Sequence, residues 1–141
     1  MSANDIRLTR VVEFYESMTP QSLESIESIY SANAAFKDPF NDVQGTEAIT
    51  AIFKHMYTQV ESPRFQVRSR MADGNEAFLS WHFLFRMHGK EQCIEGATHL
   101  RFDSTGLIVE HRDHWDAAEE LYEKLPVLGI LMRWLKRRLA S

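Results

Sequence analysis

The sequence predicts an α+β fold in which helices come first and an antiparallel sheet follows. Apolar residues recur at helical spacing up to about residue 60, and they alternate with polar residues from residue 64 to residue 115. A chain of 141 residues is about the size of one domain, so both halves are expected to share one core. Helices then cover one face of the sheet, and a cone-shaped cavity is expected between the layers.

Three helices are expected in the first part of the chain. The first ends near Thr19, and Pro20 suits the first turn of the second. Residues 31–45 are rich in Asn, Asp and Pro, which predicts turns around a short extended piece at residues 35–38. The third helix begins at Thr46. The apolar stripes are Ile6, Val11, Val12, Phe14, Tyr15 and Met18 in the first helix, Leu23, Ile26, Ile29 and Tyr30 in the second, and Ile49, Ile52, Phe53, Met56 and Val60 in the third.

Four strands are expected in the second part, over residues 64–71, 77–87, 92–103 and 107–115. Short turns that contain Gly74, Gly89 and Gly106 join them, which predicts an antiparallel meander. In the first of these strands, Phe65, Val67, Ser69 and Met71 are expected to share one face. Asp116 then caps a last helical region that extends toward the end of the chain.

Charge divides the chain unequally. Residues 1–123 carry eleven basic and twenty acidic residues, a net charge of −9, whereas residues 124–141 carry five basic residues and no acid. We expect residues 1–123 to form the domain and residues 124–141 to form a basic amphipathic helix that belongs to it, as a lid over the acidic body. Contact of this helix with a membrane surface is the less favoured alternative. An acidic body argues against binding of nucleic acid.

Two further features concern the cellular compartment. Cys93 is the single cysteine, which excludes an internal disulfide and favours a reducing cytoplasm. The first ten residues contain no apolar run of the kind that a secretory signal has, and no stretch approaches the length of a membrane-spanning helix. A cytoplasmic protein is therefore expected.

The last predicted strand carries polar residues on the face that its apolar residues mark as inner. Leu107, Val109, His111, Asp113 and Trp115 alternate with the residues of the other face. A carboxylate on an inner face is costly unless it is paired, hydrogen-bonded or wetted by a pocket. We therefore favour a pocket role for Asp113 and His111. The alternative is that Asp113 caps a loop or pairs with a neighbouring arginine.

Asp38 is the second candidate for a role in chemistry. It follows the short extended piece and precedes Pro39, which holds the backbone of Asp38 extended. Taken alone, this setting favours a turn aspartate that accepts hydrogen bonds from nearby backbone amides.

Two segments of the chain resemble a known family. Residues 29–40 read IYSANAAFKDPF and are followed by Gly45 and a helix, and the last hairpin contains LRFD at residues 100–103 and GLI at residues 106–108. These motifs resemble the ketosteroid isomerase and SnoaL-like branch of the NTF2-like superfamily over about residues 10–116. The resemblance implies a cone-shaped NTF2-like fold, with Asp38 as general base and Trp115 on the pocket wall. It leaves the activity open, because the superfamily includes isomerases, cyclases, hydratases, hydrolases and binding proteins.

The same resemblance disfavours steroid isomerisation. Phe14 lies at the position of the isomerases' catalytic tyrosine, and Tyr15 beside it is expected to point elsewhere on the helix. Thr98 replaces the protonated acid that donates to the oxyanion, and Phe53 replaces a second tyrosine of that network, although Tyr30 retains a third.

Residues 111–116 also resemble a segment of limonene-epoxide hydrolases, with Asp113 at one of their catalytic acids. The partner Arg-x-Asp pair of those enzymes is replaced by residues 80–82, which read Ser-Trp-His, so their triad is incomplete. By analogy with the family, a homodimer is expected through the outer sheet face, which carries His82, Arg86, His99, Arg101, Arg112 and His114.

These observations together predict a small-molecule enzyme that works by acid–base chemistry on an apolar substrate. Asp38 is expected to be the base, Asp113 the acid or a group that orients water, and His111 a helper. Metal and cofactor chemistry are not expected, because no cluster of metal-ligand residues is evident. The alternatives are a noncatalytic protein that binds an apolar ligand and, less favoured, a lipid-related protein at a membrane surface. The expected substrate-binding residues are Phe14, Tyr30, Phe53, Trp81, Phe83, Thr98, Leu100 and Trp115.

Overall fold

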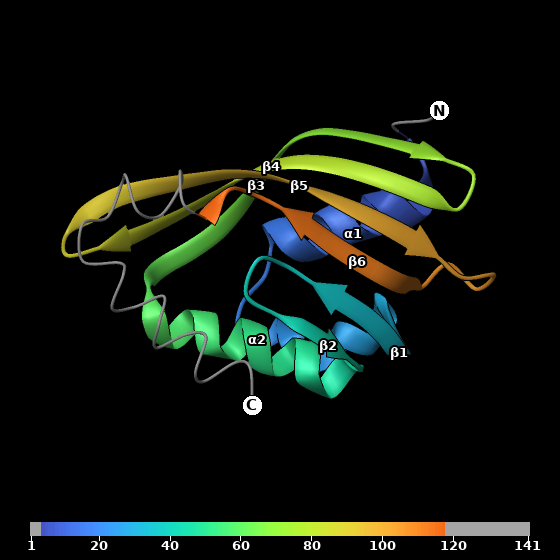
Figure 1. The fold of residues 1–141 in the computed structure, drawn as a ribbon, viewed down its shortest axis with the longest axis horizontal. Helices are drawn as coiled ribbons and strands as arrows, with labels where there is room; N and C mark the ends of the chain where they lie inside the picture. Colours follow the sequence, from blue (N-terminus) through green and yellow to red (C-terminus); the bar gives the residue numbers. More distant parts are fainter. Residues whose placement is uncertain (1–3, 118–141) are drawn as a thin grey trace.

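The computed structural model describes residues 4–117 as helices packed on one curved sheet (Figure 1). The helices are α1 (Ile6–Glu16), the 3₁₀ helix η1 (Ser22–Ser28) and α2 (Thr46–Gln59). The strands are β1 (Tyr30–Lys37), β2 (Asp42–Gln44), β3 (Glu61–Asp73), β4 (Glu76–Met87), β5 (Lys90–Phe102) and β6 (Ile108–His114). The predicted α+β fold is therefore confirmed. The predicted helix of residues 124–141, and the boundary at residue 123, lie outside the described residues.

The sheet has the strand order β2-β1-β6-β5-β4-β3. Its larger part, β3 to β6, is the predicted antiparallel meander, in which β4 pairs with both β3 and β5. The remaining part differs from the expected all-antiparallel sheet, because β1 lies parallel to β6. This parallel pair brings the segment around Asp38 beside the strand that carries Asp113.

The expectation of turns over residues 31–45 was wrong, since most of this segment forms β1 and β2. Small Ala, Ser and Asn residues give β1 a weak strand signal, and a register shift between Tyr30 and Ala35 interrupts its alternation. Tyr30 begins this strand and does not belong to the second helix, which is a 3₁₀ helix rather than an α-helix.

The helices bury their apolar faces against the concave side of the sheet. Asp5 caps α1 by accepting a hydrogen bond from the Arg7 amide at 2.9 Å. The buried residues of α1 are Leu8, Val11, Val12 and Tyr15, which follow the i, i+3, i+4, i+7 pattern of one helix face. Ile6, which the sequence analysis placed in this stripe, is 68% exposed. No helix within residues 4–117 has the length and apolar character needed to cross a bilayer.

The inner face of β3 changes along the strand. A register shift between Val67 and Ser69 reverses the alternation, so that Ala72 is buried and Met71 is 41% exposed. The expectation that Met71 shares a face with Phe65 and Val67 was therefore wrong.

Candidate active site

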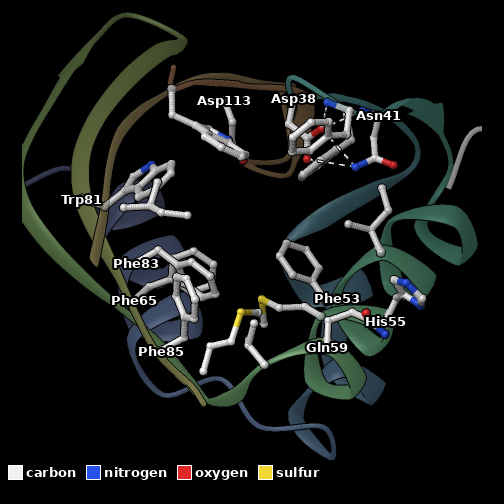
Figure 2. Close-up of a pocket in the computed structure, with 18 residues that line it drawn as sticks. Asp38, Asn41, Phe53, His55, Gln59, Phe65, Trp81, Phe83, Phe85 and Asp113 are labelled. Carbon is white, nitrogen blue, oxygen red and sulfur yellow. Dashed lines mark hydrogen bonds between the residues drawn. The ribbon is translucent and has the colours of Figure 1, made fainter. Parts of the chain in front are cut away.

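An apolar cavity of about 180 Å³ lies between the sheet and α2 (Figure 2). Aromatic side chains from β3 and β4 form one wall, and Phe53 of α2 faces them. Asp38 and Asp113 lie together at one end. The lining residues are Phe36, Asp38, Phe40, Asn41, Ile52, Phe53, His55, Met56, Gln59, Val60, Phe65, Trp81, Phe83, Phe85, Met87, Ile94, Asp113 and Trp115.

Asp113 of β6 lines the cavity, and contacts with Thr98 and His111 hold its carboxylate in place. Its Oδ1 accepts a hydrogen bond from the Thr98 hydroxyl at 2.6 Å and contacts His111 Nε2 at 2.6 Å. Both hydrogen bonds that the described residues make to this carboxylate end on Oδ1. Thr98 is the direct cross-strand neighbour of Asp113 on β5, so the sheet register itself sets this contact.

Trp81 extends the hydrogen-bond network toward the aromatic wall. Its Nε1 donates to Thr98 Oγ1 at 2.7 Å, which leaves the Thr98 hydroxyl hydrogen for Asp113. The indole lies over Gly96, its cross-strand partner, where a Cβ atom would come within 2.4 Å of the ring. Glycine at position 96 therefore gives the indole the room it needs.

Two buried tyrosines complete the network on the other side of His111. Tyr30 Oη lies 2.7 Å from His111 Nδ1, and Tyr15 contacts both Tyr30 Oη and, at 3.3 Å, the same imidazole nitrogen. Burial raises the pKa of both tyrosines above the usual value, so both hydroxyls stay protonated. If Tyr30 donates to Nδ1, the hydrogen of the neutral imidazole is on Nε2 and points at Asp113. The donors of the network then converge on one carboxylate oxygen.

A second cavity, of about 30 Å³, lies on the sheet side of the first and shares Phe53, Phe65, Trp81 and Asp113 with it. Tyr15, Thr98 and His111 also line it. A space of this volume with several polar groups is large enough for one water molecule. Asp113 thus borders both the larger cavity and this small one.

Asp38 follows β1, and its turn aims it at the same cavity. Its Oδ1 accepts hydrogen bonds from the backbone amides of Phe40 at 2.8 Å and Asn41 at 2.7 Å, the turn arrangement that the residues alone favoured. The Asn41 side-chain amide contacts Oδ1 at 3.0 Å and Oδ2 at 3.1 Å. Burial raises the pKa of Asp38, the hydrogen bond from Asn41 opposes that rise, and the nearby charge of Asp113 adds to it.

The structure gathers most of the residues that were expected to bind substrate, but not all of them. Phe53, Trp81, Phe83 and Trp115 line the apolar cavity, and Thr98 lines the small one. Tyr30 is fully buried in the network and lines neither.

Two more of the expected substrate-binding residues lie outside the lining of these cavities. Leu100 is fully buried in the core and lines neither cavity. Phe14 packs edge-on against Tyr15 and also lines neither cavity.

Tyr15 is a member of the buried network that was not expected from the sequence. It was expected to point away, but it is buried at the centre of the α1 stripe and contacts Tyr30 and His111. Tyr15 lies four residues after Val11 and seven after Leu8, the spacing of residues on one face of a helix. This spacing could have identified Tyr15 as an inward-facing residue. Within residues 4–117, no group of three or more His, Cys, Asp or Glu side chains is placed to hold a metal ion.

Solved structures share this fold at low sequence identity. A hypothetical protein with a ketosteroid isomerase-like fold from Catenulispora acidiphila, in complex with trimethylamine, has 15% identity and a TM-score of 0.69 over 83% of this chain and 90% of its own. A protein assigned to the polyketide cyclases from Acidithiobacillus ferrooxidans has 17% identity and a TM-score of 0.72, over 89% and 98% of the two chains. An LEH-like epoxide hydrolase from M. tuberculosis has 14% identity and a TM-score of 0.70, over 90% and 95%. These likenesses show the NTF2-like fold.

Comparison of sequences gives the family. No curated protein sequence matches the chain. The family model of the SnoaL-like domain matches residues 11–111, which include η1, β1 to β5, α2 and His111 of the network. The chain therefore belongs to the SnoaL-like domain family.

Proposed function

We propose that this protein is an acid–base enzyme that acts on an apolar small molecule in the cavity, with Asp113 as the base and Asp38 as the acid. One observation carries the proposal: two carboxyl groups, one from β6 and one from the turn after β1, lie at one end of an otherwise apolar, aromatic cavity. Burying two such groups together is costly for stability, and that cost is typical of a catalytic site.

Two observations favour these roles over the reverse ones that the sequence suggested. Asp113 Oδ1 accepts from Thr98 and His111, which stabilises the carboxylate, while its second oxygen can take a proton from a substrate or from water. Asp38 also accepts hydrogen bonds, from Phe40 and Asn41, but burial outweighs them and raises its pKa, which favours Asp38 as the proton donor. One carboxylate and one carboxylic acid form a complementary pair for proton transfer.

The reaction class is an isomerisation, a cyclisation, or a hydration or hydrolysis, each of which moves a proton between substrate and protein. The names of two structural neighbours, an epoxide hydrolase and a protein assigned to the polyketide cyclases, fit acid–base work on small molecules. The cavity of about 180 Å³ is only a little larger than the 150 Å³ cavity that holds benzene, so the substrate is nearer in size to one ring than to a steroid.

The experiment is a turnover screen with matched variants. Monocyclic epoxides and monocyclic enolisable ketones are incubated with the protein, and products are followed by mass spectrometry. Asp113→Asn is expected to lower the rate by about 10²–10⁴-fold, and Asp38→Asn by less, because an amide can still donate a hydrogen bond. Asp42→Asn makes the same chemical change on exposed β2 and should leave the rate unchanged. Retention of the wild-type rate by Asp113→Asn would contradict the proposal.

A second candidate is a binding protein without catalysis. The hydrogen bonds of Asp38 to the amides of Phe40 and Asn41 favour it, because a turn could require this carboxyl group for structural reasons alone. Ligand binding that the two Asp→Asn substitutions leave unchanged, without turnover of any compound in the screen, would favour this candidate.

A further inference from the structure

The carboxyl side chains that line the cavity face no lysine or arginine in its described lining. Asp38 and Asp113 line it, and among the described lining residues none is Lys or Arg. His55 and Gln59 lie on the side of the cavity away from the two acids (Figure 2). Within the described part of this cavity no lysine or arginine lies beside the two acids, whereas Lys37 and Arg112 line a separate, more open pocket that both acids also border.

The free acceptor at this end of the cavity is the second oxygen of Asp113, because both hydrogen bonds that the described residues make to this carboxylate end on Oδ1. Asn41 Oδ1 also has no hydrogen-bond partner among the described residues, but this atom is itself buried and is not open to a ligand in the cavity. A ligand that brings a donor or positive charge would satisfy the Asp113 oxygen, whereas an anionic ligand would not.

The aromatic wall adds to the same preference. Eight of the lining residues are aromatic, and Figure 2 shows Trp81, Phe65, Phe83 and Phe85 grouped along one side of the cavity. The faces of aromatic rings carry partial negative charge and attract cations, most strongly where water is excluded. Aromatic rings and a carboxylate around one small space are the features that bind alkylated ammonium groups.

We propose that the cavity selects an apolar ammonium ion of about one ring in size, with the positive charge held beside Asp113 and against the aromatic wall. This inference rests on the proposed function, because it names the substrate class of the same site. A monocation balances the charge of the Asp113 carboxylate, which no lysine or arginine of the described cavity lining balances. The cavity of about 180 Å³ sets the size, as for the proposed substrate.

The test compares two probes of the same shape that differ in charge. Trimethylanilinium is a permanent cation, and tert-butylbenzene is its neutral isostere. Affinities are measured by calorimetry, and methyl-labelled methionine NMR locates the binding. Met56 and Met87 line the cavity and should shift, whereas Met71, exposed on β3, should not. We expect the cation to bind at least about tenfold more tightly than the neutral probe.

The variants separate charge from folding. Asp113→Asn should abolish the preference for the cation while tert-butylbenzene still binds, which also shows that the variant is folded. Asp38→Asn should keep most of the preference, and Asp42→Asn all of it. The proposal is overturned if the neutral probe binds as tightly as the cation, or if neither probe shifts Met56 and Met87. The proposed function fails on a different result, namely turnover that survives Asp113→Asn.

Discussion

Substitution of Gly96 by alanine tests how the aromatic wall positions the network. A Cβ atom at this position would lie 2.4 Å from Cη2, 2.6 Å from Cζ2 and 2.9 Å from Cζ3 of Trp81. Carbon atoms in contact prefer about 3.5–4.0 Å, so the ring edge must retreat by roughly 1 Å or more. Trp81 is 7% exposed and lines both cavities, so a retreat of the ring disturbs its packing and takes up space that a ligand would use.

The expected cost follows from this geometry. Overpacking of this kind costs about 1–3 kcal/mol. If the indole moves far enough to lose its 2.7 Å hydrogen bond to Thr98, the unsatisfied donor adds about 1–3 kcal/mol. Each kcal/mol should lower the Tm by a few degrees in a chain of this size. Loss of this hydrogen bond also frees the Thr98 hydroxyl from its fixed orientation, so the substitution should weaken ligand binding or turnover.

A double-mutant cycle with Trp81→Phe provides the control. Phenylalanine lacks the outer indole ring that Gly96 accommodates, so Gly96→Ala should be nearly neutral in that background. Thermal and urea unfolding of the four proteins give the coupling energy. Equal costs of Gly96→Ala with Trp and with Phe at position 81 would refute the reasoning, because the cost would then not come from the indole.

Three further predictions concern buried and capping polar groups. His111→Phe leaves Asp113 and the tyrosine hydroxyls without their shared partner, so the free energy of unfolding should fall by more than about 2 kcal/mol. Urea unfolding measures this change, and a loss below about 0.5 kcal/mol would contradict the prediction. Burial raises the pKa of Asp38, so the contribution of this residue to stability is present at low pH and is lost as the pH rises through that pKa. Asp38→Asn should therefore raise the Tm at neutral pH. The gain in Tm over the wild type should shrink in acid. The hydrogen bond from Arg7 lowers the pKa of Asp5 to about 2, from the usual 3.8; Asp5→Ala should cost about 1 kcal/mol at neutral pH, and the difference from wild type should vanish as the pH falls from 3.8 toward 2.

The periodic parts of the sequence predicted the structure well. Stripes at helical spacing located α1 and α2, and alternation located the meander of β3 to β6, because these patterns reflect burial of one face. The same alternation placed His111 and Asp113 on the inner face, where His111 is 3% exposed. The predicted role of Asp38 needed the family resemblance, because its local sequence alone favours a structural turn.

The features that the sequence could not predict depend on partners far apart in the chain. β1 is a strand because it pairs with β6, more than 70 residues later, and its small residues carry little strand propensity. The bulge that turns Met71 outward depends on the register with β4. Phe14 and Tyr15 point about 100° apart around α1, and the apolar stripe of the sequence includes both. The stripe alone therefore could not tell which of the two rings reaches the network, and the structure shows that it is Tyr15.

The central claim is that burial, together with the nearby charge of Asp113, raises the pKa of Asp38, the proposed acid, above its ordinary value. Carboxyl-carbon NMR of the aspartate side chains, followed against pH in the wild type and in Asp113→Asn, measures this directly. Asp38 lies near Asp113 of β6, accepts hydrogen bonds from Phe40 and Asn41, and shares the lining of a second, more open pocket with Lys37 and Arg112. We predict that Asp38 titrates above its ordinary pKa of 3.8 in the wild type and at a lower pH in Asp113→Asn. A wild-type midpoint at or below 3.8, or one that Asp113→Asn leaves unchanged, would contradict the account.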